Sequence, residues 1–590
     1  MKKISSPIIY EFDYSEEAIK RIEHQMKNEQ DEKYLLRFPT VYIVNDKEKN
    51  NQYSVYIGET TNIKRRTLEH LKNDKISRED WDKLSSSENS KIMVIGHDHF
   101  NKSLTLDIEN KLMHYLSSVS SVNHIYNRRT NDQHEYYSSD EMEPIFSKIW
   151  RKLRKVNKDL FPLESVIRDS ALFKASPFHK LTEEQFEAKD KIIMKIEEAL
   201  NRNKTGQLIL VAGEAGSGKT VLMSSLFYDL FQLSQEDSEN VILKNNSQYL
   251  LVNHDQQLIV YEQIAEKLGI LSKKNPNIVS KPTSFITKHS PEEKVDILIV
   301  DEAHLLWTQG KQAYQGDNQL KDLLERAKVV VAVFDPNQVL SREQYWDDEE
   351  FNYLINTTNL YGNYIELNNQ MRINGSQETV EWIRQLVDTQ EVNNIPEDNH
   401  YDLRIFKSPT EMYDEIKKQA KNQNSGISRM LATFDWEYID KKRPEGKNYW
   451  EVTVDDFSLP WNLQLPQSKE LKRRNRKKAW AEQEQTIDEI GSTFTIQGFD
   501  LNYAGVIIGP SVKYRDGKII FDRTASKNKK ATQQRTLKDG KRYLSDTLLK
   551  NELNVLLTRG VNGLYLYAVD EALQEKLMEA QNGGIKDEKN

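Results

Sequence analysis

A glycine-rich run in the middle of the chain has the residue types and spacing that bind phosphate. It reads Gly213-Glu-Ala-Gly216-Ser-Gly218-Lys219-Thr220, and the apolar segment Leu208–Ala212 precedes it. Glycines let backbone N–H groups face an anion at the start of a helix, where the helix dipole favours negative charge. The lysine would reach the β- and γ-phosphates, and the Thr220 hydroxyl would ligate Mg²⁺. We therefore expect ATP and Mg²⁺ at this loop.

Two adjacent carboxylates, Asp301 and Glu302, end the apolar run that starts at Val295. At the carboxyl end of a buried strand, Asp301 would hold the magnesium and Glu302 would polarise the attacking water. The alternative, a surface acidic pair capping a helix, is weak after so apolar a run.

A different chemistry is indicated nearer the N-terminus. Tyr42, Tyr56-Ile57-Gly58, Arg66, His70, Glu109 and Asn127 occur between residues 39 and 137. Phosphodiester cleavage needs a metal for the phosphate, a base for water and a cation for the transition state. Arg66 and His70 are four residues apart and would share a helix face. The other reading is that the tyrosines are ordinary strand aromatics and His70 is a plain helix residue.

Alternating strands and helices are predicted to position these residues. Two short strands, Thr40–Val44 and Tyr53–Ile57, flank a turn-rich segment and predict a hairpin. A basic helix (63–72), a strand (91–96) and a helix (104–117) complete this unit. From 181 onward, strands at 207–212, 249–252, 296–300 and 329–334 alternate with helices, which is typical of a parallel α/β sheet.

The chain has 590 residues, which exceeds one core and predicts several domains. We predict an α/β protein with an arm (1–38), a nuclease domain (39–137), a junction (138–180), a first lobe (181–360), a second lobe (361–570) and a polar tail (571–590). The second lobe carries a Trp-rich and basic insert (435–481). The junction is where we expect the two chemistries to be coupled.

Composition narrows the class of protein. Cysteine is absent, which excludes disulfides and thiol nucleophiles and favours a reducing cytoplasm. No apolar run is long enough to span a bilayer, so no membrane partner is expected. The net charge is −8, so nucleic acid would have to bind at local basic patches.

The middle and C-terminal part resembles the superfamily 1 helicases, nearest to their Schlafen-like branch. Six motifs occur in the expected order, the P-loop and Asp301-Glu302 among them. The resemblance implies two RecA-like lobes with ATP in the cleft. It also implies that Gln185 reads adenine, Gln338 senses the γ-phosphate, Arg372 reaches the phosphates, Thr495 couples ATP to the nucleic-acid strand and Arg559 is the arginine finger. The large insertions of repair helicases are not evident, so unwinding and strand translocation both remain open.

The N-terminal unit resembles the GIY-YIG nucleases, although Thr40-Val41-Tyr42 keeps only the tyrosine of the first triplet. The resemblance implies that Glu109 is the single ligand of Mg²⁺ or Mn²⁺ and Arg66 binds the phosphate. Tyr42, with Tyr56 and His70 nearby, would position and deprotonate water, and Asn127 would complete the cleft. A tyrosine needs a depressed pKa for this role near neutral pH.

A strongly basic run in the insert predicts contact with nucleic acid. Residues 468–478 contain seven cations and one acid, and the cations include Lys472, Arg473, Arg474, Arg476 and Lys477. Such a run contacts backbone phosphates without reading bases. It could equally be solvated surface, and Trp450, Trp461 and Trp480 could stack on bases or form the core of the insert.

Together these patterns predict an ATP-dependent nuclease–helicase acting on nucleic acid, with single-stranded or forked DNA as the expected form. The pairing resembles bacterial nuclease–helicase proteins of phage defence, and repair is the main alternative. A second hypothesis is a nucleic-acid-stimulated ATPase whose N-terminal unit only binds DNA. The sequence leaves the oligomeric state, the polarity and the choice of DNA over RNA undetermined.

Overall fold

The structure is a computed structural model that describes residues 4–583 except 128–135, 138, 169, 273–274, 312, 371, 422–425, 477 and 538–539. It divides into two compact units. Unit 1 comprises Met1–Leu181, Ser224–Glu239 and Val260–Ile278, and unit 2 comprises Thr182–Met223, Asn240–Ile259 and Val279–Asn590. No helix of the described residues is long and apolar enough to cross a membrane.

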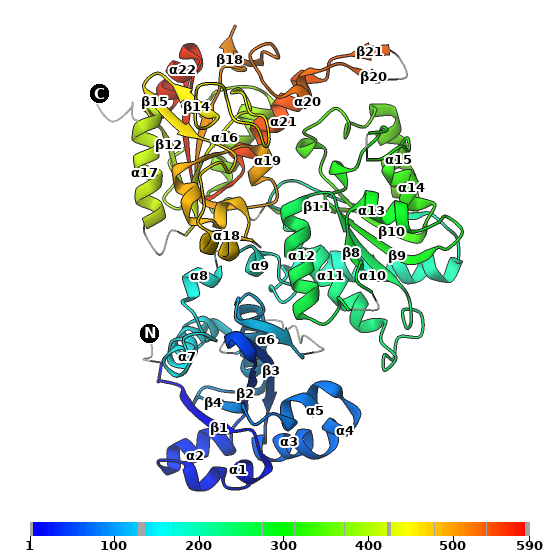
Figure 1. Cartoon of the computed structure of the whole chain (residues 1–590), viewed down its shortest axis with the longest axis vertical. Coiled ribbons are helices and arrows are strands. Elements are labelled where there is room, and N and C mark those ends of the chain that lie inside the picture. The colour runs from blue at the N-terminus through cyan, green and yellow to red at the C-terminus, as the bar shows by residue number, and fades with distance from the viewer. Residues whose placement is uncertain are drawn as a thin grey trace. The chain divides into compact units, whose positions relative to one another are not determined.

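Unit 1 is a small α+β fold around a five-stranded sheet of order β1-β4-β2-β3-β5 (Figure 1). Its strands are β1 (Ile8–Asp13), β2 (Thr40–Lys47), β3 (Tyr53–Thr60), β4 (Ser90–Gly96) and β5 (Val122–Ile125). Its main helices are α1 (Glu16–Lys20), α2 (Glu29–Leu36), α3 (Ile63–Glu69), α5 (Glu79–Ser86), α6 (Lys102–Ser117) and α7 (Met142–Val156).

The predicted hairpin is present, since β2 pairs with β3 antiparallel and Tyr42 faces Gly58 in the register. β2 lies between β4 and β3, and its Val41–Val44 stretch is buried on both faces, which explains why this strand does not alternate in polarity. The predicted helix 63–72 is α3 followed by one π-helical turn at His70–Asp74.

The arm predicted for 1–38 belongs instead to unit 1. β1 pairs with β4, and Phe12, Ile19 and Leu35 are buried in the same cluster as Tyr42. The predicted junction 138–180 also lies in unit 1, where Phe146 and Trp150 of α7 surround Tyr115 of α6. Both segments carry apolar residues at helical spacing, and these residues are buried in unit 1.

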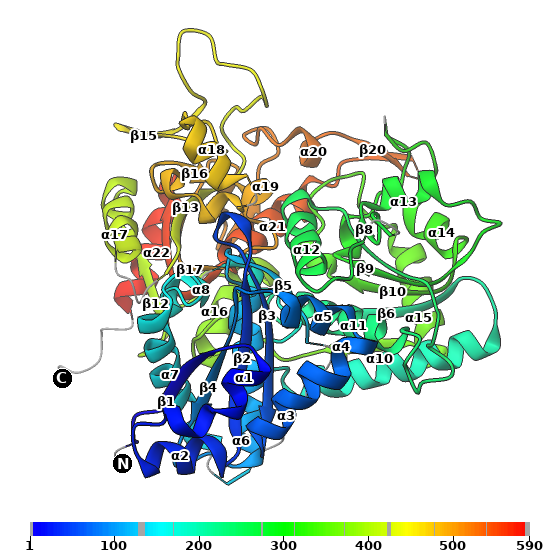
Figure 2. The ribbon, with the colours of Figure 1, turned by 60° about the horizontal axis from the view of Figure 1, so that its bottom comes forward.

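Unit 2 begins with a six-stranded, fully parallel sheet of order β11-β6-β10-β9-β7-β8. The strands are β6 (Gln207–Gly213), β7 (Gln248–Val252), β8 (Val279–Ser280), β9 (Val295–Asp301), β10 (Ala327–Phe334) and β11 (Tyr364–Leu367). Helices lie on both of its faces in Figures 1 and 2, and this explains the uninterrupted apolar runs of β9 and β10. They include α10 (Glu183–Arg202), α11 (Lys219–Leu233), α12 (Asp255–Lys267), α13 (Pro282–Lys288), α14 (Gln319–Leu324) and α15 (Asp348–Leu360).

A second parallel sheet of order β12-β22-β17-β13-β16 forms the other lobe of unit 2. Its strands are β12 (Asp402–Ile405), β13 (Ser428–Ala432), β16 (Ile490–Gly491), β17 (Leu501–Ile508) and β22 (Gly560–Ala568). Its helices include α16 (Gln377–Asp388), α17 (Pro409–Lys421), α19 (Thr493–Ile496), α21 (Ser545–Leu557) and α22 (Glu571–Gly583). The predicted parallel α/β architecture with two RecA-like lobes is therefore present.

Two boundaries in unit 2 differ from the prediction. β11 at 364–367 pairs with β6, so the first sheet extends past residue 360. The predicted polar tail contains α22, whose Leu573, Leu577 and Ala580 are buried. The insert holds a small hairpin, β14 (Glu451–Val454) and β15 (Phe457–Pro460), and the basic helix α18 (Lys469–Asn475).

Candidate functional sites

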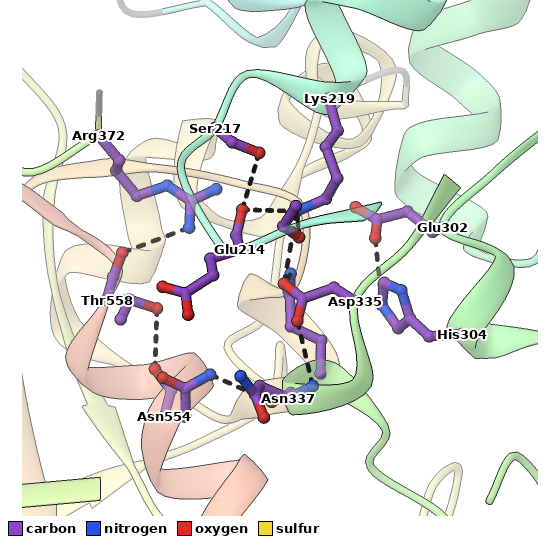
Figure 3. Close-up of polar contacts among 12 residues, drawn as sticks. Glu214, Ser217, Lys219, Glu302, His304, Asp335, Asn337, Arg372, Asn554 and Thr558 are labelled. Atoms are coloured by element: carbon purple, nitrogen blue, oxygen red, sulfur yellow. Dashed lines mark hydrogen bonds and ion pairs between the residues drawn. The ribbon is translucent and has the colours of Figure 1, made fainter. Parts of the chain in front are cut away.

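The glycine-rich loop joins β6 to α11, as predicted (Figure 3). Gly216 and Gly218 have φ angles of +94° and +74°, which favour glycine. A Cβ at Gly216 would lie 2.7 Å from Cβ of Arg372, and one at Gly213 would lie 2.6 Å from the Ser217 hydroxyl. At these two positions the loop therefore has no room for a side chain.

Lys219 is buried at the start of α11. Its ammonium donates to the Gly213 and Glu214 carbonyls, at 2.7 and 2.6 Å, and lies 3.4 Å from Asp335 (Figure 3). Burial raises the pKa of Asp335, but Lys219, His304 and the Gln338 amide more than offset this, and the pKa lies below its ordinary value. Asp335 is thus an ionised partner of Lys219, a role that the sequence analysis did not assign.

Thr220 and Asp301 are connected through Gln257 of α12. The Gln257 amide donates to Oδ2 of Asp301 at 2.7 Å and to the Thr220 hydroxyl at 3.3 Å. The two predicted magnesium ligands are therefore brought to one place by a residue that no motif indicated.

Glu302 has a left-handed backbone with φ of +52°, which is uncommon outside glycine and asparagine. Its carboxylate lies 3.1 Å from Nε2 of His304 (Figure 3). Burial lowers the pKa of His304, so this imidazole is neutral near pH 7. The buried Glu302 carboxylate is next to Asp301, as a water-orienting group would have to be.

Arg559 follows α21 and is completely buried. Its guanidinium donates to Oε1 of Gln338 at 3.3 Å and to the carbonyls of Val555 and Phe499. These acceptors are all neutral, and burial lowers the pKa of Arg559 to about 9. A buried cation with only neutral acceptors suits the arrival of an anion.

Arg372 lies beside the same loop. Its Nε is 2.6 Å from Asp500, and its guanidinium donates to the Thr558 carbonyl at 3.4 Å. Gln338, the predicted γ-phosphate sensor, donates to Asp335 at 2.6 Å and so connects Lys219 to Arg559. The predicted phosphate-binding residues therefore converge from both lobes.

Two predicted residues have local structural partners. Gln185 closes a capping box with Thr182 at the start of α10, and its amide donates to the Ser217 carbonyl at 3.2 Å. Thr495 donates to the Ser492 carbonyl and accepts from the Ser492 N–H, both at 2.9 Å. The contact with Ser217 connects Gln185 to the phosphate loop. The contacts with Ser492 place Thr495 in the first turn of α19.

The basic run of the insert is exposed where it is described. Lys472, Arg473, Arg474 and Arg476 on and after α18 are exposed, whereas Lys477 lies outside the described residues. Trp461 and Trp480 are buried in lobe 2, at 0% and 2% exposure, so they form the core of the insert rather than a stacking surface.

In unit 1, Tyr42 and His70 lie within hydrogen-bonding distance. The Tyr42 hydroxyl is 2.9 Å from Nε2 of His70, and Nδ1 of His70 is 2.5 Å from Asp74. Burial, followed by Arg66, lowers the pKa of His70 to about 4, so the ring is neutral. With its Nδ1–H donating to Asp74, the ring accepts from Tyr42 through Nε2. Asp74, which lies four residues after His70 in the π-helical turn, is not among the predicted site residues.

Tyr56, Arg66 and Glu109 all act electrostatically on Tyr42, and Arg66 and Glu109 also act on Tyr56. Burial raises the pKa of Tyr42 well above its ordinary value, opposite to the shift that a general base needs, and Arg66 counteracts this. Burial and then Glu109 raise the pKa of Tyr56. The pKa of Glu109 is raised to about 8 by burial and by Glu59.

Gly58 has a steric role in this arrangement. A Cβ at Gly58 would lie 2.5 Å from the ring and hydroxyl of Tyr42, so only glycine lets the tyrosine lie across β3. Trp81 stacks on His70 with ring centroids 3.7 Å apart. The ring of His70 is therefore held between Trp81 and Tyr42.

Asn127, predicted to complete the cleft by hydrogen bonding, has local backbone partners. Its side-chain amide pairs with the backbone of Ile57, accepting from the N–H at 3.0 Å and donating to the carbonyl at 2.6 Å. It extends the pairing of β5 with β3 and fixes the Tyr56-Ile57-Gly58 strand. Among the described residues, no group of three or more His, Asp or Glu side chains could hold a metal ion.

Comparison with known proteins identifies the larger part of the chain. Residues 206–570 match the family model of the Schlafen group 3 DNA/RNA helicase domain. The chain belongs to this family. An uncharacterized protein of Saccharomyces cerevisiae is 32% identical over 471 residues, covering 74% of this chain and 98% of its own.

Solved structures give weaker likenesses. The crystal structure of Pif1 helicase from Candida albicans has 11% identity and a TM-score of 0.25, covering 68% of this chain and 96% of its own. The structure of C. elegans PCH-2 has 13% identity and a TM-score of 0.19, covering 58% and 78%. These TM-scores are too low to carry an argument.

The Schlafen-family domain is that of a nucleic-acid helicase or translocase, and such a domain uses ATP and, as a rule, Mg²⁺. The buried cations and the glycine loop fit a nucleotide polyphosphate in unit 2. The residues of the predicted nuclease site lie outside the matched segment.

Proposed function

We propose that this helicase is also a nuclease, and that it couples ATP-driven movement on DNA to metal-dependent cleavage of phosphodiester bonds. Unit 1 would be a GIY-YIG endonuclease, and the lobes of unit 2 would hydrolyse ATP. The cellular role would be defence against phage or other foreign DNA, in a reducing cytoplasm.

One observation carries the nuclease proposal, namely the contact of Tyr42 with His70 over a glycine that has no room for a side chain. β2, β3, α3 and the π-helical turn contribute to it. An ordinary strand tyrosine needs neither a buried histidine partner nor a glycine across the sheet. The arrangement therefore supports a catalytic role for Tyr42 over a packing role.

The residues fit a single-carboxylate metal site. Glu109 is a carboxylate whose pKa is raised by burial and by a second carboxylate, Glu59, and a divalent cation would favour the ionised form of Glu109. Bound there, Mg²⁺ or Mn²⁺ would polarise the scissile phosphate. Glu109 would hold it, with Glu59 as its neighbour.

The protein's own groups would orient water and phosphate. Asp74 fixes His70 in the tautomer that accepts from Tyr42, and the hydroxyl of Tyr42 is thereby aimed. Arg66, whose side chain is 39% exposed, is available to bind a phosphate oxygen and also favours ionisation of Tyr42. Asn127 would act as a strand support rather than as a cleft residue.

In unit 2 we propose the following roles. Lys219, Arg372 and Arg559 neutralise the β- and γ-phosphates, and Gln338 connects two of them. Thr220 and Asp301 ligate Mg²⁺, while Glu302 orients the attacking water. Gln185 supports the phosphate loop through Ser217 and lies where an adenine contact would begin. Thr495 and the exposed cations Lys472, Arg473, Arg474 and Arg476 would contact the nucleic-acid strand, together with Lys477, which lies outside the described residues.

Plasmid cleavage tests the nuclease proposal. Wild type and Glu109→Ala are compared with Mg²⁺, with Mn²⁺ and with EDTA, and DNA binding is measured in parallel by gel shift. We expect cutting by wild type with metal only, and a loss of about a hundredfold in the variant with binding kept. Equal cutting by both proteins would contradict the role of Glu109.

The second candidate is a DNA-stimulated ATPase whose unit 1 only binds DNA. The raised pKa of Tyr42 and the altered first triplet favour it. Under this reading neither protein cuts with any metal, and removal of unit 1 cations such as Arg66 weakens DNA binding alone. The same assay on single-stranded, duplex and forked DNA and on RNA, with and without ATP, gives the substrate class.

A further inference from the structure

Helix α11 belongs to both units. It begins at Lys219 in the phosphate loop, and from Ser224 onward it is part of unit 1. Nine residues after Lys219, or about 13 Å along a helix, is Tyr228. Tyr228 is buried, and its ring packs edge-on against Phe178 of unit 1. The phosphate loop and unit 1 thus share one continuous helix.

The hydroxyl of Tyr228 donates to the backbone carbonyl of Asn127 at 3.1 Å. The side chain of Asn127 in turn holds both backbone polar groups of Ile57. Ile57 lies between Tyr56 and Gly58, and Gly58 contacts the ring of Tyr42 so closely that β3 cannot shift without moving that ring. A displacement of α11 along its axis would therefore reach Tyr42 and Tyr56 through two sets of hydrogen bonds.

Helix α12 makes a second connection of the same kind. Near its start, Gln257 contacts Thr220 and Asp301. At its end, the buried ammonium of Lys267 donates to the carbonyls of Ser117 and Val119, at 2.9 and 2.7 Å. Ser117 is the last residue of α6, the helix that carries Glu109. A cation at this end of α6 is favoured by the helix dipole.

We infer that Tyr228 is a positioning residue of the nuclease site, through which nucleotide bound at the phosphate loop sets the register of the Tyr56-Ile57-Gly58 strand. In the same way, Lys267 sets the position of α6, the helix that carries Glu109. The inference rests on the proposed nuclease function for its catalytic consequence. It assigns the coupling to α11 and α12, and the predicted coupling segment 138–180 contributes Phe178, which packs against the ring of Tyr228.

Tyr228→Phe tests the inference, because it keeps the ring against Phe178 and removes only the hydroxyl. Tyr53→Phe is the matched control. Tyr53 is a buried tyrosine at the other end of β3, and its hydroxyl accepts from Asn157 at the same 3.1 Å. Lys267→Met is the corresponding variant for α12.

Two readouts are compared with and without a non-hydrolysable ATP analogue. The first is the DNA cleavage rate, and the second is hydrogen exchange of the peptide that covers 53–60. We expect nucleotide to change both in wild type and in Tyr53→Phe. In Tyr228→Phe we expect hydrogen exchange at Ile57 to be about threefold to tenfold faster than in wild type. The ratio of each readout with and without nucleotide should approach one. DNA-stimulated ATP hydrolysis should be unchanged.

The outcomes separate this inference from the nuclease proposal. If wild type does not cut DNA, the nuclease proposal fails, and the exchange of residues 53–60 still decides whether nucleotide reaches β3 through Tyr228. A nucleotide response in Tyr228→Phe equal to that of wild type overturns the inference. The inference is also overturned if nucleotide changes neither the cleavage rate nor the hydrogen exchange of wild type. A purely structural role would slow cleavage in Tyr228→Phe equally with and without nucleotide.

Discussion

The two candidate sites of this chain differ in the charge state of their buried groups. In unit 2, Lys219, Arg372 and Arg559 are buried or nearly so, and Asp335 is kept ionised among them. In the candidate site of unit 1, burial favours the neutral form of four groups, since it raises the pKa of Tyr42, Tyr56 and Glu109 and lowers that of His70. Arg66, whose side chain is 39% exposed, stays charged beside them.

The difference teaches what each site requires of its ligand. A site with desolvated cations is organised for a polyphosphate before it arrives, and the chemistry there is mainly electrostatic. A site whose groups are neutral becomes reactive only when an incoming cation ionises them. We therefore expect nucleotide binding to be insensitive to pH and cleavage to depend on both metal and pH.

The largest effect is expected from Lys219→Ala. No other residue of the phosphate loop carries a side-chain cation, so ATP hydrolysis should fall by about a hundredfold to a thousandfold. Measurement of DNA-stimulated phosphate release checks this. Cleavage without ATP should persist in the variant, and hydrolysis at the wild-type rate would mean that the site lies elsewhere.

Asp74→Asn should have the next largest effect, on cleavage alone. An amide at residue 74 can donate to Nδ1 of His70 and reverse its tautomer, which removes the acceptor for Tyr42. We expect cleavage to fall by about a hundredfold with metal and DNA binding unchanged. Glu79→Gln, which removes an exposed ion pair with Lys83, is the control. Comparable losses in the two variants would exclude a specific role for Asp74.

DNA cleavage should depend on pH, whereas nucleotide binding should not. The pKa of Glu109 is raised to about 8, so at lower pH metal must displace a proton from it. Cleavage at subsaturating Mn²⁺ should rise about tenfold per pH unit up to about 8 and then level off. Binding of a fluorescent ATP analogue should stay flat over the same range. Glu59→Gln should shift the cleavage profile to lower pH, and an unmoved profile would refute the assignment.

The smallest effect is expected at the basic helix α18. Replacing Lys472, Arg473, Arg474 and Arg476 with serine should weaken DNA binding equally for all sequences. The salt slope should fall by about one unit for each phosphate that these cations neutralise in wild type. Fluorescence anisotropy over a range of salt concentrations measures this. A slope like that of wild type would identify the run as solvated surface.

The sequence was sufficient where chemistry is local. The phosphate loop, the strand ending at Asp301 and the Tyr42 hairpin follow from glycine spacing and apolar runs, and the structure has them on the predicted elements. The helicase family was likewise indicated by motif order. These features depend on residues that are near neighbours in the chain.

Long-range partners could not be predicted in the same way. Gln257 reaches Thr220 and Asp301 across 37 and 44 residues, and Asn127 reaches Ile57 across 70. Nothing in the spacing marks such pairs, because they depend on how the elements pack. The predictions of an arm at 1–38, which contains β1, and of a polar tail at 571–590, which contains α22, were wrong for the same reason. A short apolar stretch indicates a core only when the elements that pack against it are known. Asp74 had a local signal, four residues after His70, and so did Asp335, three residues before Gln338.

The most direct test of this account is the proton balance of metal binding to unit 1. Mn²⁺ is titrated calorimetrically into wild type and Glu109→Gln at pH 7, in two buffers of different ionisation enthalpy and without nucleotide. We predict one site that releases about one proton per metal in wild type and is lost in the variant. Equal Mn²⁺ binding by both proteins, or binding without proton release, would contradict a neutral site that is activated by its metal.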